Sequence, residues 1–378
     1  MPKVQPHKLI FYGHLLACIL PLFIVSCSRR PKTEKILIDN IAPRHDVTGQ
    51  IVDAHAGCLQ CFNGYYYLYG SRFGTNYDPT VPCPFSVYSS PNLKDWTDEG
   101  NLLKDPPKGV YYRPYVVFNA RTKKYVLWYN WYKTLWNGSA GVAVSESPTG
   151  PFVIVNQRAN LAGSSPGDGS LFEDDDGTAY YIYTDIDNDY AVRVERLNAD
   201  FTGSTRQGSD YIGFGNEAPL LFHRNNLYYV LLATLCAACP QGSEVAVETS
   251  TSPLGPYVFA GEINHQSGND NGQASSEANT AAAAGMKIGD ADPIGFIPER
   301  GKKHPFIRGQ ETWVAQLPAS GGGVLYMWMA DGWYSAGDKQ LGHDFQYWSS
   351  PLQFNTNGMI QPLKFTPRWE IIRKAESD

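Results

Sequence analysis

Short aromatic and aliphatic runs recur along the chain, each led by a tight polar turn. A turn at Asn63-Gly64 leads into residues 66–69 (YYLY), and a turn at Asp176-Gly177 leads into residues 180–183 (YYIY). Turns of this kind beside aromatic and β-branched runs are typical of antiparallel strands. The same unit occurs five times, with its apolar run at residues 66–69, 125–128, 180–183, 228–231 and 325–328.

A second pattern follows four of the five copies, in which a Ser-Pro pair precedes an aromatic residue. Ser147-Pro148 precedes Phe152, and Ser252-Pro253 precedes Tyr257. A repeat of roughly 50 to 60 residues can hold a four-stranded sheet, and such sheets arranged radially form a propeller. A β-sandwich is the alternative, but five copies in phase favour an all-β, five-bladed β-propeller forming a single domain over residues 49–378. The long gap before the fifth copy contains a low-complexity stretch near residues 263–285, which we interpret as an exposed insertion.

Composition excludes some classes of protein. The 378 residues contain 31 Lys and Arg against 37 Asp and Glu, a net charge of −6, which argues against nucleic acid as a partner. Hydrophobic residues make up 43% of the chain, enough for a large core.

The N-terminus has the pattern of an export signal. Lys3 and Lys8 precede an apolar run over residues 9–25, and residues 24–27 (IVSC) resemble a bacterial lipobox ending at Cys27. We expect residues 1–27 to be an export signal, with lipid attachment at Cys27 as one outcome, and residues 28–48 to be a linker. An uncleaved signal anchor is the alternative. Either outcome predicts a propeller outside the cytosol, secreted or anchored to a membrane.

Five cysteines follow Cys27, and four of them form two Cys-x-x-Cys pairs: Cys58 with Cys61, and Cys236 with Cys239. Such pairs suggest zinc, but an exported protein meets an oxidising compartment and no histidine pattern accompanies the pairs. The sequence therefore favours disulfides over zinc, and we expect no metal-ligand residues here.

Candidate catalytic residues lie about ten positions upstream of each recurring run, where the innermost strand of each blade is expected. Glu217 and Asp168 occupy this place in consecutive copies, so both are expected to face one funnel. Hydrolysis of a glycosidic bond needs an acid for the leaving oxygen and a second group that activates water or attacks. Glu217, beside apolar residues, is the candidate acid, and Asp168 is the candidate supporting carboxylate. The corresponding positions in the other copies are Asp53, His55, Tyr112, Arg113, Gln310 and Glu311.

Five motifs follow one another along the chain: Ala54-His55-Ala56-Gly57, Arg113-Pro114-Tyr115-Val116, Asp168-Gly169-Ser170-Leu171-Phe172, Glu217-Ala218-Pro219 and Gln310 before Thr312-Trp313-Val314. In this order they resemble glycoside hydrolase family 43, and within it the exo-β-1,3-galactanase branch. The resemblance runs from roughly Gln50 to the C-terminus. It implies a five-bladed propeller, inversion at the anomeric carbon, Glu217 as general acid and Asp168 as the carboxylate that adjusts its pKa. It also implies that Gln310 stands where other members have an aspartate base.

The base and the sugar contacts are left open by these residues. An amide removes a proton from water only as an imidic tautomer, and otherwise positions the water. Asp53 is the alternative base. Candidate substrate-binding residues are His55, Tyr112, Arg113, Asp331 and Trp333, and other aromatic residues that follow blade strands (Trp131, Trp136, Tyr334) offer flat rings for stacking on a sugar.

Three positions differ from the galactanase branch and bear on which sugar is bound. Tyr112 replaces an acidic residue, Ser71-Arg72 replaces a glutamate, and residues 236–239 (CAAC) replace a tryptophan. We therefore expect an exo-acting, inverting glycoside hydrolase of a galactan-like or other cell-wall polysaccharide side chain. A catalytically impaired carbohydrate-binding propeller is the alternative. A sialidase-type propeller would need an arginine cluster, and only Arg113 and Arg308 are evident.

The expected partners follow from these assignments. They are an oligo- or polysaccharide substrate, no nucleic acid, and a membrane only through a lipid or signal anchor, with the chain acting as a monomer. No cofactor is required, although the resemblance allows a structural calcium ion on the propeller axis. The acidic run Asp174-Asp175-Asp176-Gly177 is interpreted as a turn, because the spacing of an EF-hand and its distal glutamate are missing.

Overall fold

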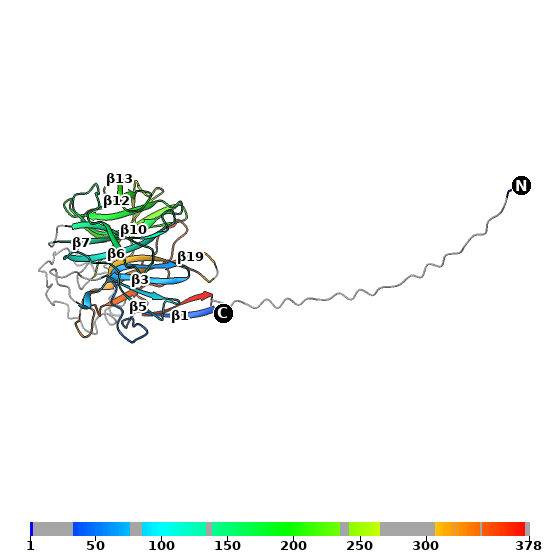
Figure 1. Ribbon diagram of the computed structural model, residues 1–378, viewed down its shortest axis with the longest axis horizontal. Helices are drawn as coiled ribbons and strands as arrows, with labels where there is room; N and C mark the ends of the chain where they lie inside the picture. Colours follow the sequence, from blue (N-terminus) through cyan, green and yellow to red (C-terminus); the bar gives the residue numbers. More distant parts are fainter. Residues whose placement is uncertain are drawn as a thin grey trace.

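The structure is a computed structural model that describes residues 1–2, 33–75, 85–133, 138–234, 242–264, 307–320, 322–340 and 342–374. It contains five antiparallel sheets arranged as the blades of a propeller (Figure 1). In each blade the strands follow one another in chain order, so each sheet is a meander. The prediction of an all-β, five-bladed propeller is confirmed.

The strands of the blades have the following bounds. Blade 1 contains β2 (His55–Phe62), β3 (Tyr65–Ser71), β4 (Phe85–Ser90) and β5 (Thr97–Asn101), with a short 3-10 helix η1 (Phe73–Thr75). Blade 2 contains β6 (Val110–Asn119), β7 (Lys124–Tyr132), β8 (Gly138–Ser145) and β9 (Val153–Asn156). Blade 3 contains β10 (Pro166–Glu173), β11 (Ala179–Asp185), β12 (Ala191–Leu197) and β13 (Ser204–Gly208). Blade 4 contains β14 (Asn216–Arg224), β15 (Leu227–Thr234), β16 (Val245–Ser250) and β17 (Val258–Glu262). Blade 5 contains, among the described residues, β18 (Gln310–Pro318), β19 (Val324–Gly332) and β20 (Phe345–Trp348).

The first strand of each blade lines the centre of the ring. Each of these inner strands contacts the inner strand of the next blade, in the order β2, β6, β10, β14, β18 and back to β2. The recurring apolar runs lie in the second strands, where the hairpin turns predicted from the sequence join them to the inner strands. The Ser-Pro pairs follow the third strands. Residues ten or so positions upstream of each run therefore do lie at the start of an inner strand.

The two ends of the folded body pair with each other. β1 (Thr33–Asp39) and β21 (Arg368–Lys374) form an antiparallel ribbon in which Thr33 lies opposite Lys374 (Figure 1). The Asn40 side chain continues this connection into blade 5, since its Nδ2 donates to the carbonyl of Trp348 at 2.9 Å. The expected linker over residues 28–48 is therefore wrong for Thr33–Asp39, whose alternating Ile36 and Ile38 are buried and need a partner strand.

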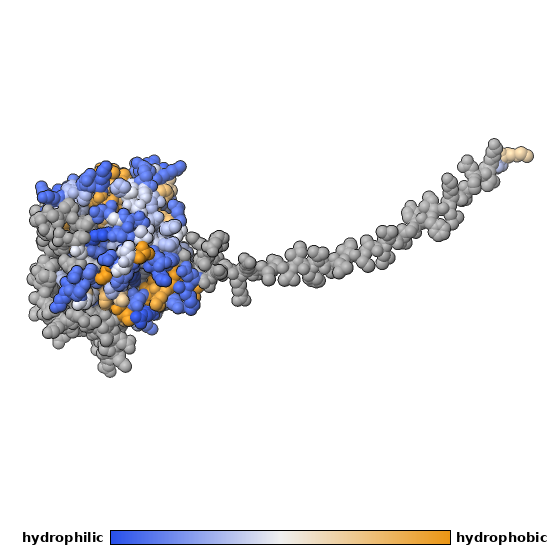
Figure 2. Space-filling view, turned by 60° about the horizontal axis from the view of Figure 1, so that its bottom comes forward, coloured by the Kyte–Doolittle hydropathy of each residue, from blue (hydrophilic) through white to orange (hydrophobic). Residues whose placement is uncertain are grey.

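Aromatic side chains fill the spaces between blades. Trp128 of blade 2 packs on Tyr181 of blade 3 with ring centroids 4.6 Å apart, and its indole nitrogen donates to the carbonyl of Phe201 at 2.6 Å. Both rings are fully buried. On the outside, hydrophilic side chains cover most of the described part of the face in Figure 2, with apolar residues in smaller groups.

The cysteine prediction is wrong for the first pair. Cys58 is a buried free thiol, 3.7 Å from the carbonyl oxygen of Pro114, whereas Cys61 is exposed. Residues three apart on a strand point to opposite faces, so the two thiols of this pair cannot meet each other or share a metal ion. Cys83, Cys236 and Cys239 lie outside the described residues.

Several other predictions fall outside the described residues. They are the export signal with Cys27, nearly all of the low-complexity segment at 263–285, and Trp136. Within the part of the chain that the structure describes, no helix is long and apolar enough to cross a membrane.

Candidate active site

All five inner strands carry an irregularity near their first residues. The pairing register shifts between His55 and Cys58, Tyr112 and Tyr115, Pro166 and Gly169, Glu217 and Leu220, and Glu311 and Trp313. At three of these places a residue other than glycine has a positive φ: Ala56 (52°), Arg113 (56°) and Ala218 (51°). A bulge turns a side chain out of the regular alternation and is frequent beside active sites. The five bulges therefore point to one end of the ring as the functional end.

Asp168 and Glu217 lie at the same level on neighbouring inner strands. The hydroxyl of Ser170 donates to the carbonyl of Pro219 at 2.8 Å, which links β10 to β14. Asp168 and Glu217 each lie two residues before this contact. Glu217 is half-buried, and its charge, together with burial, raises the pKa of nearby Tyr190. The structure thus brings the two predicted carboxylates to one end of adjacent strands.

The Asp168 carboxylate is the meeting point of three blades. Its Oδ2 accepts a hydrogen bond from the Arg113 guanidinium of β6 at 3.0 Å and one from the Gln310 Nε2 of β18 at 3.3 Å. Arg113 is 2% exposed, so this ion pair is shielded from solvent. Arg113 therefore fixes the Asp168 carboxylate on the strand next to that of the candidate acid.

Gln310 is held at both ends of its amide. Its Nε2 donates to Asp168, and its Oε1 accepts the indole N–H of Trp333 at 2.7 Å. Gln310 is 5% exposed, and its strand β18 is not a neighbour of β10 in the ring, so the contact with Asp168 spans the centre. Because the amide oxygen already accepts a hydrogen bond from Trp333, it is less available to accept a proton from water.

Arg113 crosses the axis of the propeller. One guanidinium nitrogen binds Asp168 of blade 3, and another donates to the carbonyl of Glu311 in blade 5 at 2.9 Å. The hydroxyl of Tyr115 spans the same gap to the carbonyl of Thr312 at 2.5 Å. A buried positive charge thus occupies the middle of the ring at this level. The residues here do not fit a calcium ion on the axis, because a guanidinium repels a second cation.

Glu311 points away from the funnel and into the core. Its side chain is completely buried, its Oε2 accepts the indole N–H of Trp328 at 3.3 Å, and its Oε1 has no hydrogen-bond partner. Burial raises the pKa of Glu311 to about 8, and the Trp328 hydrogen bond and the Arg113 charge offset this only in part. The surroundings of Glu311 therefore favour its neutral, protonated form over the carboxylate.

Asp53 is bound to the backbone of its own blade. Its two oxygens accept the N–H groups of Phe73 at 3.0 Å and Gly74 at 2.6 Å, which fixes η1 after β3. Burial raises the pKa of Asp53, although the nearby His55 charge and these backbone hydrogen bonds oppose the shift. The hydrogen bonds of Asp53 thus go to its own blade, and His55 Nε2 lies 3.7 Å from its Oδ1.

His55 and Asp331 pair with each other. The His55 ring is completely buried, and its Nδ1 lies 3.3 Å from Asp331 Oδ1. Asp331 Oδ2 accepts the backbone N–H of Ala56 at 2.5 Å. Both oxygens of Asp331 are thus engaged within the protein, and the pair lies beneath Trp333 rather than on an open surface.

Some of the remaining candidate sugar-binding side chains lie at the surface, and others are buried in the core. Tyr112 is half-buried and its ring lies 5.0 Å from that of Tyr132, so it can border the site. Trp131 is a core residue: it stacks on Tyr111 at 5.9 Å, and its indole nitrogen donates to the carbonyl of Gln157 at 2.7 Å. Trp333 is half-buried and Tyr334 is exposed, so these two remain as candidate sugar contacts.

Asn130 is a site residue that the motif search missed. Its Oδ1 accepts the N–H of Gly169 at 3.0 Å, and its Nδ2 donates to the carbonyl of Gly167. The side chain therefore holds the residues on both sides of Asp168. Its signal in the sequence is a single amide inside the buried aromatic run of β7 (residues 128–132, WYNWY), where a polar side chain requires a hydrogen-bonding partner.

In the part of the chain that the structure describes, one group of side chains could hold a metal ion together. It consists of Asp174, Asp175 and His223. They occupy the turn after β10 and the end of β14, which is the end of the inner strands opposite to Asp168 and Glu217. The His223 Nδ1 lies 3.5 Å from Asp174 Oδ1 and 3.2 Å from Asp175 Oδ2. These residues are not part of the candidate active site.

Two carboxylates at one mouth of a five-bladed propeller are the kind of groups that hydrolysis of a glycosidic bond requires. Comparison with known proteins agrees. The family model for glycosyl hydrolases family 43 matches residues 59–282, more than half of the chain, so the chain belongs to this family.

Solved structures of similar proteins have the same fold. An exo-β-1,3-galactanase from Clostridium thermocellum is 21% identical, with a TM-score of 0.69 over 90% of this chain and 69% of that one. An exo-β-1,3-galactanase from Phanerochaete chrysosporium, solved with β-1,3-galactotriose, is 21% identical, with a TM-score of 0.69 over 90% and 70%. A family 43 β-1,3-galactosidase with galactodeoxynojirimycin is 22% identical, with a TM-score of 0.66 over 88% and 99%.

Among curated proteins, the arabinoxylan arabinofuranohydrolase of Bacillus subtilis (strain 168) is 23% identical over 300 residues. The match covers 64% of this chain and 56% of that protein, so the chain spans little more than half the length of this relative.

Proposed function

We propose that the protein is an exported glycoside hydrolase that removes terminal sugars, with inversion, from a galactan-like or other cell-wall polysaccharide side chain. The observation that carries the proposal is the level placement of Asp168 and Glu217 on neighbouring inner strands, with Arg113 and Gln310 converging on Asp168. Galactanases and a galactosidase among the structural relatives support a galactan-like substrate.

In this proposal Glu217 is the general acid that protonates the leaving oxygen. Asp168, on the neighbouring strand, is paired with buried Arg113. A neighbouring anion disfavours loss of the proton from Glu217, because two negative charges would then lie close together. Asp168 thus acts on the acid and not directly on the sugar.

The water that attacks the anomeric carbon needs a partner on the other side of the sugar. The engaged Oε1 of Gln310 supports a role in orienting this water and Asp168, rather than in removing a proton. The two backbone donors on Asp53 support a structural role for that carboxylate. The contacts therefore support the general acid, Glu217, and its neighbour Asp168 more directly than a general base.

The test is hydrolysis of a panel of aryl glycosides and of β-1,3-linked galacto-oligosaccharides. Proton NMR of the first product distinguishes inversion from retention, because the two anomers give separate signals before they equilibrate. We expect release of single sugars with inverted configuration from the non-reducing end. Retained configuration would contradict the inverting mechanism, and internal cleavage would contradict exo-action.

A second candidate is a carbohydrate-binding propeller without turnover. Gln310 favours it, since an amide that is hydrogen-bonded at both ends is a poor base. The distinguishing result is binding of an oligosaccharide in calorimetry with no product on any substrate of the panel, in both wild type and Glu217→Gln.

Export is proposed from the N-terminal pattern of Lys3, Lys8, the apolar run and Cys27. The test is cell fractionation of the wild type and of Cys27→Ser, with metabolic labelling by a fatty acid. Label on wild type but not on the variant supports a lipid anchor. A soluble external protein without label supports a cleaved signal, and a cytosolic protein contradicts export.

A further inference from the structure

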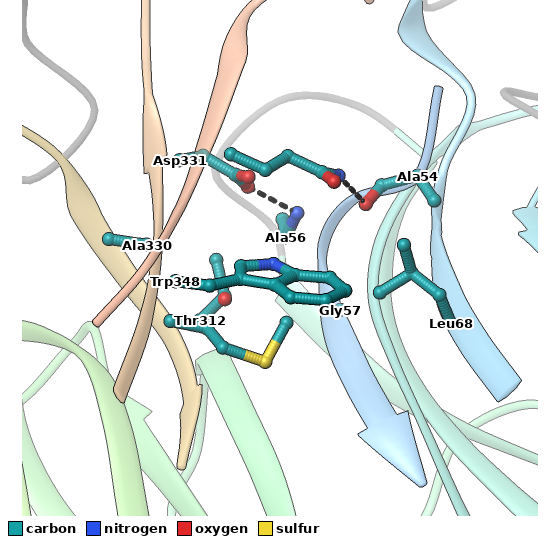
Figure 3. Close-up of a pocket in the computed structure, with 10 residues that line it drawn as sticks. Ala54, Ala56, Gly57, Leu68, Thr312, Ala330, Asp331 and Trp348 are labelled. Carbon is teal, nitrogen blue, oxygen red and sulfur yellow. Dashed lines mark hydrogen bonds between the residues drawn. The ribbon is translucent and has the colours of Figure 1, made fainter. Parts of the chain in front are cut away.

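The seam between blades 1 and 5 contains a completely buried histidine. His55 begins β2, and its ring is enclosed by Asp331 of β19, the backbone near Gly342 and the aromatic rings of Phe73 and Trp333. Figure 3 shows this seam, with the Asp331 carboxylate directed at the backbone nitrogen of Ala56. The residues drawn as sticks line a small cavity in the seam, and most of them come from β2 and from β18 to β20.

Both nitrogens of the His55 ring face hydrogen-bond acceptors. Nδ1 lies 3.3 Å from the Asp331 carboxylate, and Nε2 lies 3.1 Å from the carbonyl oxygen of Gly342. A neutral imidazole has a single N–H, so the lone pair of its other nitrogen would point at an acceptor. In a site without solvent that arrangement is costly, since neither contact could be exchanged for water. Both contacts are satisfied together only when the ring carries two protons.

The charges around the ring agree with a cation. Asp331 faces it from β19, Asp53 lies 3.7 Å from Nε2, and Asp344 approaches from the segment before β20. Burial alone would lower the pKa of His55, but these carboxylates raise it to about 9. The positive groups Arg72, near Asp53, and Arg44, near Asp331, interact with the same carboxylates.

A continuous set of contacts leads from His55 to the candidate active site. The His55 ring packs against Trp333 with centroids 6.0 Å apart, and Phe73 packs against both rings. The indole N–H of Trp333 holds Gln310 Oε1 at 2.7 Å, and Gln310 Nε2 reaches Asp168. Movement of Trp333 would therefore move the amide that contacts Asp168.

We propose that His55 is a buried imidazolium that joins the first and last blades and acts as a positioning residue for Gln310 and Asp168 through Trp333. The charged state of the ring follows from the seam alone. The positioning part rests on the proposed function, because it assumes that Asp168 takes part in the reaction.

The first experiment measures the protonation state directly. Long-range proton–nitrogen NMR on deuterated, ¹⁵N-histidine-labelled protein reports whether each ring nitrogen carries a proton. The His55 signals, among eight histidines, are assigned by their loss in His55→Gln or, if that variant does not fold, by nuclear Overhauser contacts with Phe73 and Trp333. We expect two protonated nitrogens at neutral pH that titrate near pH 9. A single protonated nitrogen at neutral pH would overturn the proposal.

The second experiment follows the positioning without substrate. The side-chain amide signal of Gln310 is recorded through the same titration in uniformly ¹⁵N-labelled protein. We expect it to shift with the midpoint of His55, and Asp331→Asn is expected to lower that midpoint for both residues. An amide signal that does not respond would refute the positioning role and leave the imidazolium in place.

The third experiment uses activity. Because His55 loses its charge near pH 9, we expect kcat/KM to fall with that midpoint, and the midpoint to move to lower pH in Asp331→Asn. His343→Gln is the matched control: His343 also pairs with an aspartate, Asp338 at 2.6 Å, but on an exposed segment, and should change neither profile nor rate. An unshifted profile in Asp331→Asn would contradict the positioning role. Absence of any turnover would count against the proposed hydrolase and leave both NMR results decisive.

Discussion

Gln310 of blade 5 donates a hydrogen bond to Asp168 of blade 3, 3.3 Å away across the centre of the ring. The same carboxylate oxygen binds Arg113 of blade 2. Three blades thus fix one oxygen of one side chain, and the position of Asp168 depends on the correct assembly of the whole ring. The amide is suited to this place because it donates to Asp168 with one atom and accepts from Trp333 with the other.

Gln310→Glu tests this arrangement. A carboxylate at this position would face Asp168 with a like charge and would lose the N–H donor. We expect kcat/KM to fall by about 10²-fold, comparable to the misplacement of a catalytic group by about 1 Å. Gln316→Glu, at an exposed position of the same strand, is the control and should retain activity. A rise in kcat would instead show that this position provides the general base.

Glu217→Gln tests the general acid. Loss of an acid slows departure of a poor leaving group by roughly 10²–10⁴-fold. We expect a large fall in kcat/KM on an oligosaccharide and a much smaller fall on a dinitrophenyl glycoside, whose leaving group needs no proton. Steady-state rates on the two substrates provide the comparison, with Glu146→Gln, an exposed glutamate, as control. Equal losses on both substrates would assign Glu217 a role other than proton donor.

Glu311 makes stability depend on pH. Burial raises its pKa from 4.5 to about 8, so the folded protein keeps a proton that the unfolded chain releases above about pH 4.5. The contribution of Glu311 to the free energy of unfolding is therefore largest below pH 4.5, and it decreases as the pH rises toward 8. We expect Glu311→Gln to remove this slope and to raise the melting temperature at pH 8 relative to wild type.

Thermal or urea unfolding at several pH values measures this effect. Glu370→Gln, on the exposed ribbon of β1 and β21, should leave the slope unchanged. The comparison is between the stability of wild type and that of Glu311→Gln at each pH. If this difference does not change between pH 5 and 8, Glu311 is ionised in the core.

Asp53→Asn separates a structural carboxylate from a base. An asparagine would direct its NH₂ group at one of the two backbone donors of Phe73 and Gly74, which costs about 1–3 kcal/mol. We expect a lower melting temperature and an unchanged acidic limb of the pH–rate profile. The alkaline limb should move to lower pH, because one of the carboxylates that raise the pKa of His55 has lost its charge. For Asp53→Ala, added azide should not restore activity. Azide rescue would identify Asp53 as the base.

The hairpins and the residues at their inner strands could be predicted because the signals are local. A turn followed by an aromatic run marks each second strand, and the positions 11 to 15 residues upstream include Asp168, Glu217 and Gln310. The partnership of β1 with β21 could not be predicted in this way, since it joins residues such as Lys35 and Glu370 that lie 335 positions apart. The contact of Asp331 with His55, instead of with a sugar, could not be predicted either, because it depends on how blades 1 and 5 pack together.

Strand geometry explains other differences between prediction and structure. A shift in register can change which side chain faces the funnel. For Gln310 and Glu311 the ordinary alternation of β18 is sufficient, because adjacent side chains point to opposite faces: Gln310 reaches Asp168 while Glu311 is buried in the core. Cys58 and Cys61 are separated by the regular alternation of β2, which the spacing of a Cys-x-x-Cys pair does not reveal.

The ribbon of β1 and β21 has a consequence for the order of folding. Blade 1 gains its second inner neighbour when β18 has been synthesised, and β1 can pair with β21 only after that. The early blades can form their own hairpins during synthesis, but the circle stays open until blade 5 forms. Because both ends of the folded body lie side by side, a circular permutant that joins them and opens the chain at an outer hairpin should assemble the same ring from a different starting blade.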